Sequence, residues 1–144
     1  DNALNPSATP SLTRLESEVI SMCADLFNGN DEVRGNITSG GTESILLAIK
    51  TARDWAKKHR PDIKRPEVII PASAHPAFVK AFHYFEMDFV PVPLKDYRAD
   101  TNAMENAITS NTILLVGSAP SYPHGLMDPI KEIAGIEGTA NYYS

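Results

Sequence analysis

Short runs of apolar residues alternate along this chain with longer segments in which apolar residues recur every three or four positions. The runs at 67–70, 88–92 and 112–117 have the length and composition of strands. Strands that are apolar on both faces and separated by helices are typical of a parallel sheet, because crossover helices bury both faces. The sequence therefore predicts an α/β fold with a mostly parallel sheet and helices on both faces.

Two more elements are expected before residue 40. Apolar residues from Ser11 onward form one helical stripe, and Thr13 and Glu16 have the spacing of a capping box. Asn28-Gly29 is a typical helix stop. Residues 35–38 are interpreted as a short strand, so the predicted order along the chain is helix, strand, and then three helix–strand pairs.

Local signals also mark the ends of the later helices. A helix is expected from about Glu43 to residue 59, and Pro76 suits the first turn of the next one. Asn102 and Glu105 fit a second capping box, for a helix that ends near Thr109.

Composition excludes several classes of protein. The chain has 144 residues, of which 42% are hydrophobic, and this is enough for one folded domain. A formal charge of -5 argues against a protein that neutralises many nucleic-acid phosphates, so no nucleic-acid partner is expected. The single cysteine, Cys23, excludes a disulfide framework and a Cys-based zinc site, and no metal is expected. No apolar run approaches the roughly 20 residues of a membrane span, and no signal peptide is recognisable; a reducing, cytoplasmic location is expected.

A glycine-rich turn, Ser39-Gly40-Gly41-Thr42, stands just before the second helix. Gly40 and Gly41 let the backbone approach a ligand, and a helix start offers unpaired N–H groups, so the turn suits a phosphate. It matches neither of the two common nucleotide-binding motifs. The alternative is an ordinary tight turn with Thr42 as the helix N-cap.

Two further loops follow predicted strands and carry side chains able to transfer protons. His75 precedes the third helix, and the 118–128 loop holds Ser121, Tyr122 and His124. Ligands of parallel sheets bind beyond the carboxyl ends of the strands, so these two loops and the glycine-rich turn are expected to converge. The alternatives are a capping or packing histidine and a polar turn that only reverses the chain.

Basic residues are concentrated between positions 50 and 65, which hold seven of the thirteen in the chain. A solvated helix face with cations near its C-terminal end explains such a cluster. Contact with an anionic membrane surface is the alternative.

Three motifs together resemble the pyridoxal-phosphate-dependent group II decarboxylase family, of fold type I. They are Thr-Ser-Gly-Gly-Thr-Glu-Ser-Ile at 38–45, Ser-Ala-His-Pro-Ala-Phe at 73–78, and Pro-Ser-Tyr-Pro-His-Gly at 120–125, with Asp-Pro-Ile at 128–130. The opening stretch from Asn5 is also similar to the family. The resemblance implies that 1–134 is part of the large cofactor-binding domain, while the tail 135–144 does not continue the family pattern.

The resemblance also implies roles for individual residues. Gly40, Gly41 and Thr42 would hold the phosphate of pyridoxal 5'-phosphate, and His75 would stack on its ring. Tyr122 would face the substrate as a proton donor or acceptor. The branch of the family that is most similar cleaves phosphorylated sphingoid bases, a small-lipid substrate, by a retro-aldol reaction to a long-chain aldehyde and phosphoethanolamine. A decarboxylase of small amino acids is the alternative within the family.

The resemblance further implies a homodimer, and a eukaryotic parent would face the cytosol on the endoplasmic reticulum through an N-terminal anchor that this chain lacks. Two family residues are missing: the lysine that holds the cofactor covalently and the aspartate against the pyridine nitrogen. We therefore expect both beyond Ile133, in a longer enzyme, and expect this chain alone to be inactive. A noncatalytic phosphate-binding α/β module is the alternative from another class of protein.

Overall fold

The computed structural model describes residues 10–136 and divides the chain into two compact units, residues 1–40 and residues 41–144. Each unit is described by itself. The opening stretch from Asn5 and most of the predicted tail, from Glu137 onward, lie outside the described residues.

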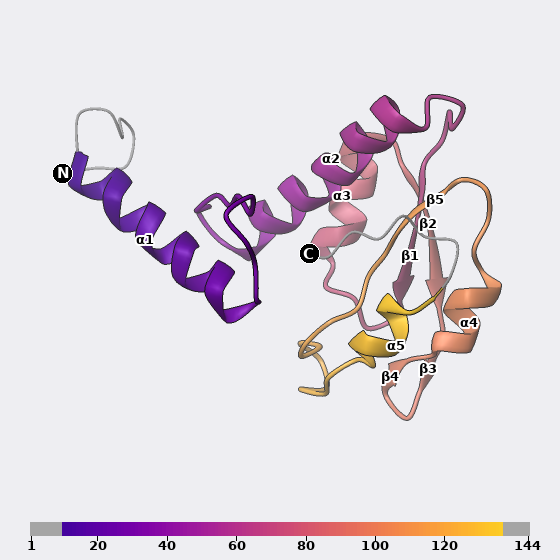
Figure 1. Cartoon of the computed structure of the whole chain (residues 1–144). Coiled ribbons are helices and arrows are strands. Elements are labelled where there is room, and N and C mark those ends of the chain that lie inside the picture. The colour runs from indigo at the N-terminus through magenta and orange to yellow at the C-terminus, as the bar shows by residue number, and fades with distance from the viewer. Residues whose placement is uncertain (1–9, 137–144) are drawn as a thin grey trace. The chain divides into compact units, whose positions relative to one another are not determined.

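The first unit contains one helix, α1 (Pro10–Leu26), coloured indigo in Figure 1. Because α1 begins at Pro10, Thr13 lies inside the helix and the predicted capping box is wrong. The predicted stop is confirmed: Asn28 has a left-handed φ of 56°, and the Gly29 N–H donates to the Ala24 carbonyl at 2.8 Å.

The strand expected at 35–38 is also wrong, because these residues form no regular element. A strand needs a neighbour to accept its backbone hydrogen bonds. Within the described part of the first unit, the rest of the chain is helix and turn, so there is no strand for this segment to pair with.

The second unit is built on a parallel sheet of three strands, as the sequence predicts. Strand β1 (Glu67–Pro71) lies in the centre, between β2 (Asp88–Val92) and β5 (Thr112–Leu115). Both pairings are parallel, and Ile69 lies opposite Val90 on one side and Leu115 on the other. The carboxyl ends of all three strands therefore lie at one edge of the sheet (Figure 1).

Helices cover both faces of this sheet, and this confirms the predicted α/β class. Helices α2 (Gly41–His59) and α3 (Ala77–Phe85) pack on one face, while α4 (Thr101–Asn106) and α5 (Ile130–Ala134) pack on the other. Successive residues of β1 point alternately into the two resulting cores. One core holds Ile49, Ala56, Ile63, Val68, Ile70, Ala81, Phe82, Met87, Ile113 and Val116. The other holds Ile69, Val92, Ala99, Met104, Ile133 and Ile136.

A short antiparallel hairpin, which the sequence analysis did not predict, follows β2 directly. Its strands are β3 (Leu94–Lys95) and β4 (Arg98–Ala99), with Lys95 opposite Arg98. Asp96 and Tyr97 form the two-residue turn, with left-handed φ values of 52° and 61°. This turn conformation suits the right-handed twist of hairpin strands, although Gly and Asn are its usual residues.

The start of α4 differs from its prediction. Asp100 is the N-cap, and its Oδ1 accepts hydrogen bonds from the N–H groups of Asn102, at 3.0 Å, and Ala103, at 3.2 Å. The predicted cap Asn102 lies inside the helix, which ends at Asn106 rather than near Thr109. The Asn-x-x-Glu spacing is therefore coincidental. Helix α5 was not predicted.

Phe82 is 1% exposed in the core formed by α2, α3 and the sheet, so Phe82→Ala should destabilise the second unit by about 3–5 kcal/mol. Tyr84→Ala, at a residue of the same helix that is 59% exposed, is the matched control and should change stability by about 0.5 kcal/mol or less. Urea unfolding of the three proteins measures both values, and equal losses would contradict this packing.

Candidate functional site

His75 lies in the loop that joins the carboxyl end of β1 to α3. Its Nδ1 accepts a hydrogen bond at 3.1 Å from the Ala77 N–H, in the first turn of α3. The capping role that we kept as an alternative is thus present. A backbone N–H can only donate, so the proton of the neutral ring must be on Nε2. This bond fixes the ring at the loop while leaving the side chain exposed.

Tyr122 meets His75 from the loop that follows β5. The two ring centroids are 6.4 Å apart, and the rings form an edge-to-face pair with an interplanar angle of 77°. The Tyr122 side chain is otherwise free of packing, because it is 88% exposed. The structure therefore brings together two of the three loops that we expected to converge.

The 118–128 loop that carries Tyr122 is held by its own backbone. The Ser121 N–H donates to the Leu126 carbonyl at 2.9 Å, and the Gly125 N–H donates to the Ser121 carbonyl at 2.8 Å. Gly125 has a φ of 63°, which a residue with a side chain rarely adopts. These bonds close a tight turn whose tip contains Tyr122 and His124.

The glycine-rich turn has the open surroundings that a ligand cradle requires. A Cβ built on Gly40 or Gly41 would meet no heavy atom within 4 Å. The Thr38 hydroxyl donates to the Gly40 carbonyl at 3.1 Å. Because α2 begins at Gly41, Thr42 lies inside the helix, and the alternative of Thr42 as an ordinary N-cap is wrong.

The direction of α2 places Gly41 and Thr42 on the same side of the second unit as the ring pair. The helix ends at His59, shortly before β1 begins at Glu67, so α2 runs opposite to the strands and starts on the side of their carboxyl ends (Figure 1). The structure does not bring the two glycines against the rings: both remain open.

Two buried hydroxyl groups occur in the loops of the ring pair. The Oγ atoms of Ser73 and Ser121 have no hydrogen-bond partner among the described residues. Buried polar groups in proteins are nearly always paired. Both loops therefore retain donor capacity that the described chain does not use, at the edge where ligands of parallel sheets bind.

Sequence reasoning missed two residues of this edge, Tyr97 and Asp128. The Tyr97 ring lies 5.2 Å from the ring of His124, and the Asp128 carboxylate is buried among backbone N–H groups. No spacing rule could reveal Tyr97, because its hairpin is too short for periodicity. Asp128 was noted only as part of a motif, although an aspartate next to an apolar segment is itself a signal of a buried acceptor.

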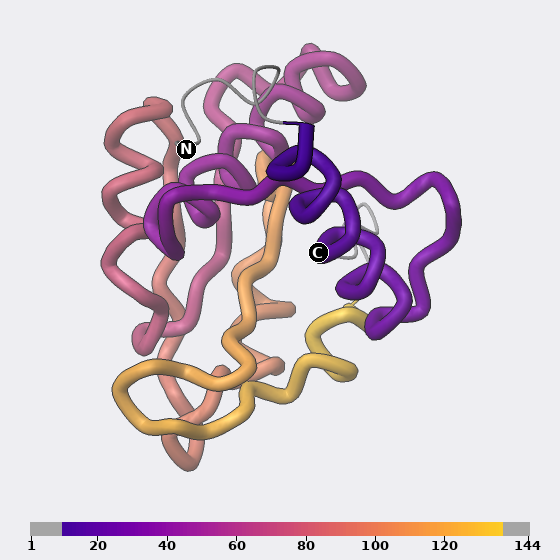
Figure 2. The backbone as a smooth tube through the Cα atoms, turned by 90° about the vertical axis from the view of Figure 1, so that its left-hand side faces the viewer, coloured from indigo at the N-terminus to yellow at the C-terminus, as the bar shows by residue number. Residues whose placement is uncertain are grey.

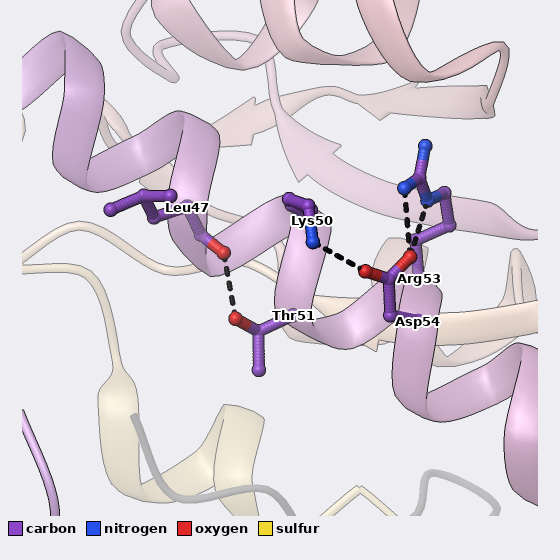
Figure 3. Close-up of polar contacts among 5 residues, drawn as sticks. All are labelled: Leu47, Lys50, Thr51, Arg53 and Asp54. Atoms are coloured by element: carbon purple, nitrogen blue, oxygen red, sulfur yellow. Dashed lines mark hydrogen bonds and ion pairs between the residues drawn. The ribbon is translucent and has the colours of Figure 1, made fainter.

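The basic cluster proves to be largely paired within the chain, which favours a solvated helix face over a membrane contact. Asp54 accepts hydrogen bonds from Lys50 and Arg53 (Figure 3). Arg60 donates to two backbone carbonyls, and Arg65 forms an ion pair with Asp88. Within residues 10–136, no helix combines the length and apolar character needed to cross a membrane.

Curated proteins similar to this chain include the sphingosine-1-phosphate lyases of several eukaryotes. Identity is 50% over 134 residues for sphingosine-1-phosphate lyase 1 of Mus musculus, with 92% of this chain and 23% of the mouse protein covered. For the Saccharomyces cerevisiae lyase it is 45% over 138 residues, covering 94% of this chain and 23% of the yeast protein. This chain is homologous to the sphingosine-1-phosphate lyases. It spans about a quarter of the length of these relatives, and no family model matches it.

Solved structures agree with this homology. The sphingosine-1-phosphate lyase of Burkholderia pseudomallei has a TM-score of 0.86 and 41% identity, over 94% of this chain and 33% of that chain. Glutamate decarboxylase of Lactobacillus brevis has a TM-score of 0.80 at 22% identity, over 93% and 33% of the two chains, and so shares the fold. The resemblance to the group II decarboxylase family and the expected fold are confirmed.

The described residues fit the phosphate and ring of a pyridoxal phosphate cofactor. The open glycine turn at a helix start offers N–H donors, an exposed imidazole stands beside a phenol, and two loop hydroxyls lack partners. One structural neighbour, Oryza sativa TDC, was solved with PLP. The cofactor's lysine is not evident among the described residues: Lys50 is paired with Asp54, and Lys80 lies over the ring of Tyr84.

The ion pairs of Asp54 predict a pH dependence of stability. Hydrogen bonds from Lys50 and then Arg53 lower the pKa of Asp54 from 3.8 to about 2. A pKa that is lower in the folded state stabilises the protein above the unfolded value of 3.8, and this stabilisation is lost as the pH falls through about 2.

The stability difference between the wild type and Asp54→Asn should therefore shrink between pH 4 and pH 2. Urea unfolding across this range measures it. Asp62→Asn, at an exposed carboxylate outside the cluster, is the control. A difference for Asp54→Asn that does not change with pH would contradict the role of these contacts.

Proposed function

We propose that this chain forms the front part of the cofactor domain of a pyridoxal-phosphate-dependent lyase that cleaves phosphorylated sphingoid bases. The observation that carries the proposal is the 50% identity to a sphingosine-1-phosphate lyase over 92% of the chain, a stretch that includes the ring pair. The alternative of a small-amino-acid decarboxylase rests on neighbours of about 20% identity, which support the fold alone.

In this proposal, each site residue has a definite task. The N–H groups of Gly40, Gly41 and Thr42 hold the cofactor phosphate, assisted by the partial positive charge at the start of α2. The face of His75 stacks on the cofactor ring, and the Nδ1 bond to Ala77 keeps the imidazole in place. When bound, the cofactor accepts the electrons released by the breaking carbon–carbon bond.

Tyr122 is proposed to handle the proton of the substrate. The phenol oxygen takes the proton of the C3 hydroxyl group, the bond between C2 and C3 breaks, and C3 leaves as a long-chain aldehyde. C2 then receives a proton, and phosphoethanolamine leaves. Its exposure of 88% leaves the Tyr122 side chain accessible to a substrate, and the ring contact with His75 places it beside the proposed cofactor ring.

We also propose that the lysine and the pyridine-nitrogen aspartate are supplied from outside residues 1–133, so that this chain alone has no activity. A homodimer and a cytoplasmic or cytosol-facing location are part of the same proposal. Sedimentation of the full-length protein that carries this chain tests the dimer.

Purified full-length protein should contain pyridoxal phosphate with visible absorbance, and borohydride should fix the cofactor to a lysine outside residues 1–133. With a phosphorylated sphingoid base it should release an aldehyde and no carbon dioxide. Release of carbon dioxide from an amino acid would identify a decarboxylase instead. A protein that takes up no cofactor, or a 144-residue chain that prefers nucleotides, would support the noncatalytic phosphate-binding module.

His75→Ala in the full-length protein should raise the dissociation constant for pyridoxal phosphate about tenfold, because the stacking contact is lost. His83→Ala is the matched control, since His83 is an exposed imidazole on α3 whose ring contacts Tyr84. Its dissociation constant should stay within about twofold of the wild-type value. Equal effects of the two changes would remove His75 from the cofactor site.

A further inference from the structure

The carboxylate of Asp128 is buried, with 4% of the residue exposed, and both of its oxygens accept backbone hydrogen bonds. Oδ1 accepts from the Ala99 N–H at 2.8 Å, and Oδ2 accepts from the Ser118 N–H at 2.8 Å. Hydrogen bonds to a charged acceptor are among the strongest in proteins. A buried carboxylate is tolerated only when it is paired in this way.

These two bonds join segments that are far apart in the sequence. Ala99 ends the β3–β4 hairpin, and Ser118 begins the 118–128 loop, which ends at Asp128 itself. The Asp128 N–H also donates to the Ser118 carbonyl at 2.9 Å and closes the base of the loop. In Figures 1 and 2, the hairpin and this loop lie at the same end of the sheet, beyond the strand arrowheads.

A second contact joins the tips of the same two segments. The rings of Tyr97, in the hairpin turn, and His124, in the loop, have centroids 5.2 Å apart and an interplanar angle of 56°. Tyr97 makes this contact from a left-handed conformation, with a φ of 61°, that is rare for a bulky residue. Such conformations persist only where the surroundings hold them.

We propose that Asp128 is a positioning residue for the site: with Tyr97 as a support at the tip, it clamps the 118–128 loop to the hairpin and so sets Tyr122 against His75. The inference rests on the proposed function, since that function gives Tyr122 its task. Asp128 does not touch the substrate. Its effect reaches Tyr122 through the loop, whose base it fixes and whose tip carries both Tyr122 and His124.

Asp128→Asn tests the clamp in the full-length enzyme with almost no change of shape. An amide has one acceptor oxygen, and its NH₂ group cannot accept from a backbone N–H, so one of the two bonds must be lost. Asp100→Asn is the matched control: Oδ1 alone accepts both of its hydrogen bonds, and asparagine keeps that oxygen.

Two measurements apply to this pair of variants. Amide hydrogen exchange in the peptides that contain Ala99 or Ser118 should become faster in Asp128→Asn and stay unchanged in Asp100→Asn. The turnover number per bound cofactor should fall about tenfold or more in Asp128→Asn, with KM within about twofold, because the proton-transfer group is misplaced. A merely structural role lowers the folded fraction and leaves turnover per bound cofactor unchanged, and that result would overturn the proposal.

Tyr97→Gly keeps the test decisive if Asp128→Asn does not fold. Glycine relieves the left-handed turn, so the melting temperature should rise, while loss of the ring contact should lower turnover. Tyr97→Phe keeps the ring and should stay within about twofold of wild-type turnover. A Tyr97→Gly enzyme with unchanged turnover would overturn the tip support.

The exchange measurement needs neither cofactor nor activity, so the two proposals can fail separately. Wild-type enzyme without lyase activity overturns the proposed function, while exchange at Ala99 and Ser118 still decides whether Asp128 clamps the loop. An active wild type whose Asp128→Asn variant keeps slow exchange and full turnover overturns the clamp alone.

Discussion

Burial of β1 on both faces is the constraint on which the rest of the second unit depends. Val68 and Ile70 are 0% and 4% exposed in one core, and Ile69 between them is 0% exposed in the other. A strand of this kind needs a neighbour on each side and a layer of helices on each face. Parallel pairing then requires crossover connections, and these place the loops with His75 and Tyr122 at one edge.

The same constraint explains which elements could be predicted. The three sheet strands and the helices α2 and α3 follow from apolar patterns that tolerate little alternative pairing. Helix caps were less predictable, because the residue spacing around Thr13 and Asn102 fits a capping box while the helices begin elsewhere. The β3–β4 hairpin has strands of two residues, and such strands are too short to show a period.

The site was predictable to the extent that it consists of residues next to strand ends. His75 and Tyr122 each follow a predicted strand, and their rings meet at 6.4 Å. The contacts of Asp128 were beyond sequence reasoning, because they join it to a backbone group 29 residues away. Tyr97 contradicted its local signal: a two-residue hairpin turn favours Asn or Gly, and tyrosine there indicates a tertiary contact instead.

The structure also shows that the capping and ligand-binding interpretations of His75 do not compete. The hydrogen bond from Ala77 uses Nδ1, at one side of the imidazole, and leaves the ring face and Nε2 outside that bond. A histidine that stacks on a flat cofactor needs a fixed ring plane, and a bond to the first turn of α3 supplies one without covering the face. The cap is therefore what makes a stacking role feasible, since a freely rotating side chain would lose conformational entropy on binding.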